Sequence, residues 1–412
     1  MWSLGSVQEP SVSKKTIDQV DVAGKRVLMR VDFNVPIKDG VIRDDRRIRE
    51  AVPTIQNVLD RGGSVVLMSH LGRPGGKGFV AEYSLQPVAE RLSELLQRPV
   101  VFPSQDCVDD AAASAVNALE DGQVLLLENV RFHKAERTGD GAFASKLAAY
   151  GDVYCNDAFG TSHRSDSSMV AVPQSMASKP RVAGLLVTKE IQHLSTSLKD
   201  PARPFTAVLG GAKVSDKINA VEHFLRNADH VLIGGAMAYT FLEAMGKNVG
   251  ESRVERESLA QAKKLIELAA LESSDLHLPE DHVCSTEFAE SSGDIEVFED
   301  EIPSGFLGLD IGPDTQGRYA GIIAKSKTVV WAGPMGVFEW RPFRIGTMEI
   351  ANSLADATDA GAMTIVGGGD TAAAAEQFKI ANRVKHVSTG GGASLAMLSG
   401  EPMPGIEALD DA

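Results

Sequence analysis

Residues 27–34 read Val-Leu-Met-Arg-Val-Asp-Phe-Asn, an apolar, β-branched run that ends in polar side chains. Similar short apolar runs recur along the chain, and longer helical patterns separate them. They lie at 65–68, 100–102, 124–127, 153–155, 206–209, 231–233, 282–284, 328–331, 364–366 and 384–387. Apolar runs that alternate with helices are typical of parallel strands buried on both faces. The sequence therefore predicts a doubly wound, parallel-sheet α/β fold that is present twice.

Length and charge limit the kinds of protein that this sequence can encode. A chain of 412 residues is long enough for two α/β domains of ordinary size. With 56 acidic against 41 basic residues and a net charge of −15, it is a poor candidate for binding nucleic acid or an anionic membrane. Its three cysteines are too few for a disulfide framework, and no segment matches a signal peptide or a membrane span. We therefore expect a cytoplasmic protein.

One helical pattern separates the two halves of the chain. Its apolar residues, at 187, 191, 194 and 198, recur on one helix face between Pro180 and Pro201. We interpret it as a helix over 181–200 that joins an N-terminal domain, 1–180, to a C-terminal domain, 201–395. The alternative is a helix that lies inside one of the two domains.

Charged and polar side chains gather after the strands of the first half. Ligands of open α/β sheets bind outside the carboxyl ends of the strands. Here these regions collect arginines and histidines in an otherwise acidic protein, and guanidinium groups suit phosphate and carboxylate oxygens. These regions lie at 30–34, 69–74, 128–133 and 156–164, and Arg47 lies in a further basic run at 46–49. As a set they favour an anion site, although any single arginine is more often a solvated side chain in a local salt bridge.

Glycine-rich segments follow the strands of the second half. They lie at 210–211, 234–235, 333–336, 367–369 and 390–392. A loop without β-carbons lets backbone N–H groups and a helix N-terminus approach a phosphate, so repeated loops of this kind favour a nucleotide platform over plain tight turns. Lys213 and Lys217 would share one face if a helix begins there. Asp370 could hold a magnesium ion that bridges phosphates.

The usual nucleotide-binding fingerprints are absent. The chain has no G-x-x-x-x-G-K-[ST] motif, and it lacks the protein-kinase His-Arg-Asp and Asp-Phe-Gly set. A dinucleotide-dependent dehydrogenase is an alternative, but the first strand ends in Asp32-Phe33-Asn34 rather than in G-x-G-x-x-G. A two-lobed solute-binding protein is another alternative, yet it would normally carry an export signal and would not need Lys213 and Asp370.

Eight stretches, in order along the chain, resemble phosphoglycerate kinases over about Thr16 to Leu409. They lie at 30–36, 69–74, 127–132, 156–169, 209–217, 331–339, 367–371 and 388–394. The resemblance implies a reversible, Mg²⁺-dependent transfer of a phosphoryl group from 1,3-bisphosphoglycerate to ADP, which gives 3-phosphoglycerate and ATP. It also implies a monomer with a glycerate lobe and a nucleotide lobe, in which residues 396–412 return to the first lobe.

Carried over to matching positions, the resemblance assigns roles to residues of the first half. The glycerate site would comprise Asp32, Asn34, Arg47, His70, Arg73, Arg131 and Arg164. The last three would grip the phosphate that stays on the triose. The first two would receive its hydroxyl and carboxyl end, and Arg47 would lie beside the transferred group.

The resemblance likewise assigns a nucleotide site to the second half. It would comprise Gly211, Lys213, Lys217, Gly235, Gly333, Pro334, Glu339, Gly367, Gly368, Gly369, Asp370 and Thr371. Lys213 would meet the transferring phosphoryl group, Lys217 the other phosphates, and Glu339 the ribose hydroxyls, while Asp370 would hold Mg²⁺. Ala332 stands where many family members have Asn, and its side chain cannot make a hydrogen bond there, although the neighbouring backbone could still line the site.

The implied reaction needs no general base, because the attacking carboxylate is already ionised at neutral pH. We therefore interpret His70 and His163 as hydrogen-bond donors or supporting groups. Charge on the transferred phosphoryl group would be met by Arg47, Lys213, magnesium and the helix N-terminus at Gly368–Gly369. Since the two sets of groups lie on different lobes, we expect lobe closure to assemble the site.

Overall fold

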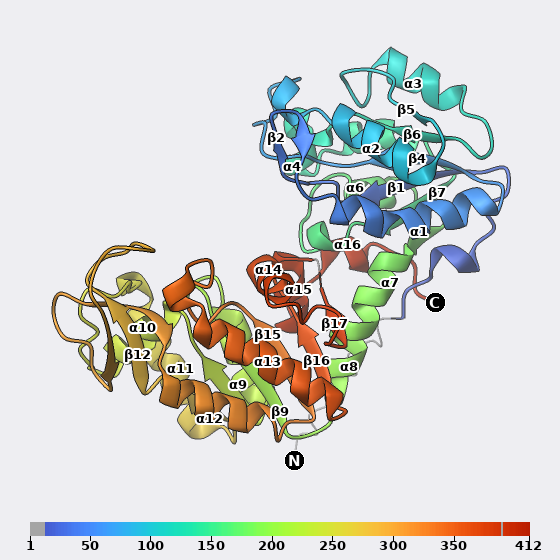
Figure 1. Ribbon diagram of the computed structural model, residues 1–412. Coiled ribbons are helices and arrows are strands. Elements are labelled where there is room, and N and C mark those ends of the chain that lie inside the picture. Colours follow the sequence, from blue (N-terminus) through green and yellow to red (C-terminus); the bar gives the residue numbers. More distant parts are fainter. Residues whose placement is uncertain (1–12, 389) are drawn as a thin grey trace. The chain divides into compact units, whose positions relative to one another are not determined.

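The computed structural model describes residues 13–388 and 390–412, and the chain divides into two compact units. The first unit comprises the residues up to Ser195 together with Pro402–Ala412, and the second comprises Thr196–Glu401. Each unit contains its own six-stranded parallel sheet (Figure 1). The predicted doubly wound α/β fold, present twice, is therefore confirmed.

The first sheet has the strand order β5-β6-β4-β1-β7-β8, and every neighbouring pair is parallel. Its strands are β1 (Arg26–Val31), β4 (Ser64–Met68), β5 (Val100–Val101), β6 (Val124–Leu126), β7 (Val153–Asp157) and β8 (Arg181–Ala183). In the centre, Arg30 of β1 pairs with Met68 of β4 and with Asn156 of β7. Strands β4, β6 and β7 are buried along their whole length, as their apolar runs predict.

The helices of the first unit are amphipathic. In α1 (Arg46–Asp60), Ile48, Ala51, Ile55 and Val58 recur at helical spacing and join the hydrophobic core against the sheet. Before the chain enters the second unit, the other helices are α2 (Gln86–Leu96), α3 (Asp110–Asn117), α4 (Lys134–Thr138), α5 (Gly141–Ala148), α6 (Ala171–Ser175) and α7 (Leu185–Ile191). A short hairpin, β2 (Ile37–Lys38) with β3 (Val41–Ile42), precedes α1.

The second sheet has the strand order β11-β10-β9-β15-β16-β17 and is also parallel throughout. Its strands are β9 (Phe205–Leu209), β10 (His230–Ile233), β11 (Asp275–His277), β15 (Thr328–Ala332), β16 (Met363–Val366) and β17 (His386–Val387). The helices of this unit are α9 (Ile218–Asn227), α10 (Met237–Ala244), α11 (Leu259–Leu271), α12 (Pro313–Ile323), α13 (Ile345–Asp359), α14 (Gly369–Gln377) and α15 (Gly392–Leu398). Its core contains the buried ring of Trp331 on β15.

One predicted strand does not belong to the parallel sheets. Residues 282–284 lie in β12 (Asp281–Ser285), which forms a separate antiparallel sheet with β13 (Ile295–Glu299) and β14 (Leu307–Ile311). Only three residues separate β11 from β12. A parallel neighbour needs a crossover of a dozen or more residues, so β12 cannot continue the parallel order beside β11.

The helical stretch between the sheets begins later than predicted. Arg181–Ala183 adds β8 to the first sheet by pairing with β7, so α7 begins at Leu185 instead of at 181. A π-helical segment, Gln192–Thr196, and α8 (Ser197–Lys199) continue it without a break. Val187, Ile191 and Leu194 are buried at the predicted helical spacing.

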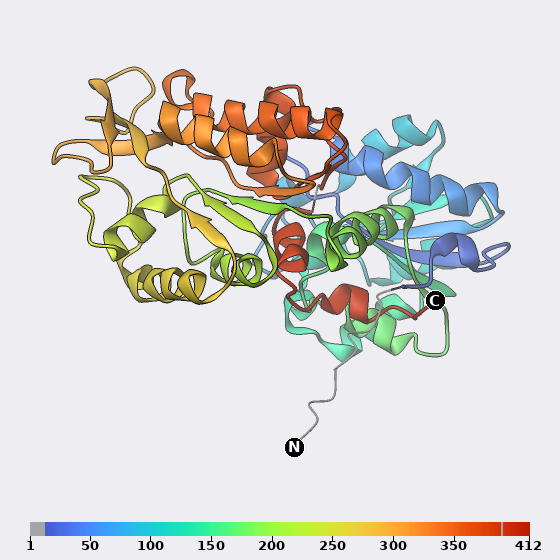
Figure 2. The same cartoon turned by 90° about the horizontal axis from the view of Figure 1, so that it is seen from below.

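The C-terminal segment belongs to the first unit from Pro402 onward. It includes α16 (Pro404–Glu407), and Figure 2 shows this segment in red near the C-terminus. The backbone N–H of Gly405 donates to the carbonyl of Ser162 at 2.9 Å, and Asn156 Nδ2 donates to the carbonyl of Gly405 at 2.9 Å. Residues 396–398 still belong to α15 of the second unit, so the return to the first unit begins six residues later than the predicted 396.

Candidate functional site

The carboxyl ends of β1, β4, β6 and β7 lie at one edge of the first sheet, because all four strands are parallel. The loops that follow β1 and β4 are tied together there. The backbone N–H of Phe33 donates to Ser69 Oγ at 2.9 Å, and that of Gly72 donates to Asn34 Oδ1 at 2.9 Å. The predicted side chain of Asn34 is thus fixed between two strand ends.

His70 lies buried among guanidinium groups. Its Nδ1 is 3.1 Å from Nη2 of Arg30, and an arginine nitrogen can only donate. Burial, followed by the charges of four arginines, holds the pKa of His70 well below its ordinary value. The four are Arg30, Arg131, Arg47 and Arg164. A neutral ring that accepts at Nδ1 carries its proton on Nε2, so His70 can donate a hydrogen bond at neutral pH.

Asp32 and Arg47 form an ion pair beside this histidine. Arg47 Nη1 donates to Asp32 Oδ2 at 2.9 Å and to the carbonyl of Asn34 at 3.3 Å. Asp32 Oδ1 lies 3.8 Å from His70 Nδ1. The Arg47 side chain remains 33 % exposed, whereas Asp32 is nearly buried. The guanidinium group is therefore held in place at one nitrogen while part of it still reaches solvent.

The three arginines predicted to grip a phosphate lie near one another. Arg73 and Arg131 line one cavity of about 330 Å³, and the charge of Arg164 acts on Arg131. Arg131 donates to the carbonyl of Gly72 at 3.1 Å and contacts Asp166 at 3.4 Å. Among the described residues, the buried Nε atoms of Arg131 and Arg164 have no hydrogen-bond partner. An unpartnered donor of Arg131 beside a basic cavity, with a second one on the nearby Arg164, suits a phosphate ligand.

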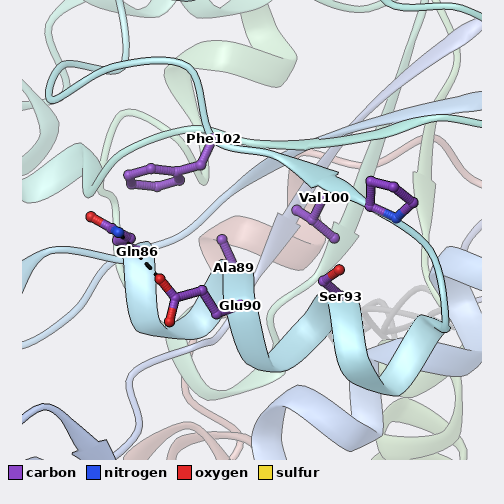
Figure 3. Close-up of a pocket in the computed structure, with 7 residues that line it drawn as sticks. Gln86, Ala89, Glu90, Ser93, Val100 and Phe102 are labelled. Carbon is purple, nitrogen blue, oxygen red and sulfur yellow. Dashed lines mark hydrogen bonds between the residues drawn. The ribbon is translucent and has the colours of Figure 1, made fainter.

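A second cavity in the first unit lacks this character. It measures about 640 Å³ and lies between α2 and β5 (Figure 3). Its lining is Gln86, Ala89, Glu90, Ser93, Pro99, Val100 and Phe102. Gln86 Nε2 donates to Glu90 Oε1 at 3.2 Å, and Ser93 Oγ donates to the carbonyl of Arg98 at 2.8 Å, so these polar groups already have partners. With one carboxylate and no basic group, this cavity does not suit an anion.

Arg30 is a site residue that the sequence analysis did not select. It is fully buried, donates from Nε to Ser168 Oγ at 2.8 Å, and orients His70. Ser168 in turn donates to the buried carboxylate of Glu136, from Oγ at 2.6 Å and from N at 2.9 Å. A charged residue inside an apolar strand is rare, and this signal in the sequence could have identified Arg30 as a site residue.

In the second unit, three glycine-rich loops pack against one another through their backbones. The N–H of Gly211 donates to the carbonyl of Pro334 at 2.9 Å, and that of Gly235 donates to Met335 at 2.9 Å. A β-carbon on Gly235 would lie 2.5 Å from the N of Gly211, and one on Gly333 would lie 2.2 Å from the carbonyl oxygen of Gly210. These glycines therefore permit close packing of loops.

The loop before α14 is more open. A β-carbon on Gly369 would meet nothing within 4 Å, and Gly368 has a φ of +97° at the N-terminus of this nine-residue helix. Thr371 Oγ1 accepts from the N–H of Gly333 at 2.7 Å and thus joins this loop to the packed group. Asp370 is exposed, so its carboxylate faces solvent beside the free helix N-terminus.

The two lysines do not share a helix face. Helix α9 begins at Ile218, and Lys217 closes the preceding turn through a 2.8 Å backbone hydrogen bond to Val214. Burial lowers the pKa of Lys217, while Asp370 and Asp216 oppose that shift. Lys213 is exposed. The condition for a shared face, a helix that begins at Lys213, is therefore not met, although the charge of Asp370 acts on Lys217.

The remaining predicted residues lie around the same loops. Ala332 is the last residue of β15 and is buried, whereas Glu339 is exposed. The backbone of Phe338, next to Glu339, accepts a hydrogen bond from Gln377 Nε2 at 3.1 Å. Gly367 is buried directly after β16. None of these contacts reveals a ligand, so the nucleotide roles stay predictions.

Asp310 is a second residue that the sequence analysis did not select. Its carboxylate accepts from the N–H of Gly346 at 2.7 Å and of Ile311 at 2.9 Å. A β-carbon on Gly336 would lie 2.4 Å from Asp310 Oδ1. The buried carboxylate thus connects the segment after β15 to the start of α13. Burial raises the pKa of Asp310 to about 8, against two backbone hydrogen bonds that lower it.

This raised pKa predicts that the second unit loses stability as the pH rises from about 4 to about 8. An aspartate in an unfolded chain titrates near 4. Between the two values the folded state retains a proton that the unfolded state has released, so the free energy of unfolding falls with increasing pH. Urea unfolding followed by tryptophan fluorescence measures this slope, since Trp331 and Trp340 lie in this unit.

Asp310→Asn is expected to flatten the slope, because it removes the titrating group. The matched control is Asp294→Asn, at an exposed position of the same unit. A slope that persists in Asp310→Asn and equals that of the control variant would contradict the assignment.

Known proteins with a similar sequence come from one family. The family model described as phosphoglycerate kinase matches residues 17–401. A phosphoglycerate kinase of Rhodopirellula baltica is 54 % identical over 404 residues, covering 97 % of this chain and all of that protein. One of Chloroherpeton thalassium is 50 % identical over 401 residues, again covering 97 % and 100 %.

Solved structures agree with these sequence relatives. The structure of phosphoglycerate kinase from Coxiella burnetii matches with a TM-score of 0.85 at 38 % identity, covering 96 % of this chain and 98 % of that one. The enzyme from Pyrococcus horikoshii matches with a TM-score of 0.82 at 32 % identity and the same coverage. In the described part of this chain, no helix combines the length and apolar character needed to cross a bilayer.

Proposed function

This chain belongs to the phosphoglycerate kinase family, and from that premise we propose which of its residues perform the family's reaction. The reaction is the reversible transfer of a phosphoryl group from 1,3-bisphosphoglycerate to ADP, which gives 3-phosphoglycerate and ATP in glycolysis. Two different sets of groups, an arginine-rich set in the first unit and a glycine-rich set in the second, are available for the two substrates.

The arginine-rich set is proposed as the glycerate site. Arg73, Arg131 and Arg164 bind the phosphate that stays on the triose, and the unpartnered Nε atoms of the last two are the observation that carries this assignment. Asp32 and Asn34 receive the hydroxyl and carboxyl end.

The loop at Gly368–Gly369 is proposed to receive the nucleotide phosphates, with Lys213 and Lys217 beside it. Free backbone N–H groups at a helix N-terminus bind phosphate, and the open space at Gly369 permits this approach. The exposed carboxylate of Asp370 is a hard oxygen donor, which fits Mg²⁺, an ion usually held by one or two carboxylates and substrate phosphates. When bound there, Mg²⁺ would neutralise phosphate charge. Glu339 is proposed to bind the ribose.

Phosphoryl transfer in this site relies on positioning and charge. The acceptor carboxylate is ionised at neutral pH, so no side chain has to remove a proton from it. Arg47 and Lys213 stabilise charge on the group in transfer, together with the backbone N–H groups of Gly368 and Gly369. His70, neutral and oriented by Arg30, donates a hydrogen bond from Nε2.

Closure of the two units is proposed because the two sets of groups belong to different units, while transfer requires reacting atoms about 3 Å apart. We expect the radius of gyration from small-angle scattering to decrease when 3-phosphoglycerate and an ATP analogue are both bound. Either ligand alone serves as the control. A radius that stays constant with both ligands would contradict closure.

The direct test of the reaction couples ATP formation from 1,3-bisphosphoglycerate and ADP to a dye-linked readout. We expect turnover that needs both substrates and added Mg²⁺. A dehydrogenase or a solute-binding protein would give no ATP. We further propose that the enzyme is a cytoplasmic monomer, as the family resemblance and the three free, buried cysteines suggest. Mass photometry tests the monomer.

A further inference from the structure

A cluster of two histidines and one aspartate lies in the second unit, away from the nucleotide loops. His230 is the first residue of β10, and Asp275 and His277 are the first and last residues of β11. The glycine-rich loop follows β10 at its opposite end. None of the three residues belongs to these glycine-rich loops, and the cluster takes no part in the site described above.

The sheet itself brings these three residues together. His230 pairs directly with Asp275 in the parallel register, and Leu232 pairs with His277. Paired residues point to the same face, and so do residues two apart on one strand. His230, Asp275 and His277 thus share one face of the sheet at its edge.

Two of the distances between their ligand atoms are close to the edges of a tetrahedral metal site. His277 Nε2 lies 3.3 Å from His230 Nδ1, which lies 3.5 Å from Asp275 Oδ2. All three ligand atoms are within 4.8 Å of one another. A tetrahedron with metal–ligand bonds of about 2.0–2.1 Å has edges of about 3.3–3.4 Å, and imidazole nitrogens with one carboxylate oxygen are ligands that Zn²⁺ accepts.

We propose that His230, Asp275 and His277 bind a divalent transition-metal ion, Zn²⁺ in the first instance, with a fourth position open to water. The exposed Asp275, whose side chain is 72 % accessible, leaves a path from solvent. The ion would fasten the edge strand β11 to β10.

The surroundings of the cluster are compatible with a cation. Arg318 is the positive group with the largest effect on the pKa of His277, but its Nη1 is paired with Glu280 at 2.9 Å, and Nη2 donates to the carbonyl of Leu278. The hydroxyl of Tyr319 donates to the carbonyl of His277 at 3.0 Å and anchors the strand. Burial, followed by Arg318, lowers the pKa of His277 to about 4, so its ring is neutral and can offer a lone pair at neutral pH.

A competing cluster in the first unit suits a metal less well. Asp106, Cys107 and His133 also lie within 4.8 Å of one another. Burial raises the pKa of the Cys107 thiol well above its ordinary value, so binding there requires loss of a costly proton. His133 therefore provides the matched control.

The test is calorimetric titration of the untagged, metal-free full chain with Zn²⁺ at pH 7.5, with Co²⁺ absorption as a geometric readout. We expect one ion per chain, intense visible bands typical of tetrahedral Co²⁺, and a rise in the melting temperature of the second unit. His277→Gln and His230→Gln should each weaken binding at least tenfold, whereas His133→Gln should not.

Kinase turnover in Mg²⁺ should be equal in the wild type, His230→Gln and His277→Gln, which separates this proposal from the proposed function and verifies folding. Folding of His133→Gln is verified by circular dichroism instead, because His133 lines the cavity that contains Arg73 and Arg131. Absence of Zn²⁺ binding at 100 μM metal would overturn the proposal. So would binding that survives both His277→Gln and His230→Gln, or that is lost in His133→Gln.

Discussion

Replacing Arg47 by alanine is expected to lower kcat about 100-fold or more while leaving the chain folded. Loss of one donor that stabilises charge in a transition state has an effect of about this size. The structure explains how the donor is held, because Nη1 is fixed by Asp32 at 2.9 Å and by the Asn34 carbonyl at 3.3 Å. The Arg47 side chain is one-third exposed, and the nearly buried Asp32 still accepts from the N–H of Asn34 at 3.3 Å, so folding should survive.

Steady-state kinetics of Arg47→Ala, with circular dichroism to verify folding, measure this effect. Arg47→Lys should recover only part of the activity, since an ammonium group cannot reproduce the guanidinium fork. The control is Arg49→Ala, two residues along α1, whose exposed side chain pairs with Asp45 at 3.2 Å. Its kcat should stay near that of the wild type. A kcat of Arg47→Ala within threefold of that of Arg49→Ala would contradict the proposed role of Arg47 beside the transferred phosphoryl group.

Replacing Gly333 by alanine is expected to lower the unfolding free energy of the second unit by about 3 kcal/mol or more. Two causes act together. The φ of Gly333 is +106°, a conformation that alanine rarely adopts, and the added β-carbon would lie 2.2 Å from the carbonyl oxygen of Gly210. The neighbouring loop would have to move, and with it the hydrogen bond from the Gly333 N–H to Thr371.

Urea unfolding followed by tryptophan fluorescence tests this prediction, and nucleotide affinity should weaken in parallel. The control is Gly317→Ala in α12, where an added β-carbon meets nothing within 4 Å. This change should be neutral or stabilising by up to about 1 kcal/mol, because alanine favours a helix over glycine. If the unfolding free energy of Gly333→Ala is within about 1 kcal/mol of the wild-type value, the backbone packing of these loops does not constrain that position.

Much of the fold follows from short-range patterns. Apolar runs separated by helical periodicity predict parallel strands, and the structure has them at almost every predicted position. The exception at 282–284 has an identifiable cause. An apolar run looks the same in the sequence whether its strand is parallel or antiparallel to its neighbour. Here the connection after β11 is too short for a parallel crossover, and β12 joins an antiparallel sheet.

The sequence by itself determined the two α/β units, the family and the chemical character of the strand ends, because these depend on residue type and on order along the chain. Only the tertiary structure decided which side chains contact one another within the site. Arg30 orients His70 from 40 residues away, and Asp310 reaches Gly346 across 36. It also showed that some glycines, such as Gly235, allow loops to pack closely, whereas Gly369 lies in open space at a helix N-terminus. Such distinctions rest on distances between atoms of remote segments, which residue order does not specify.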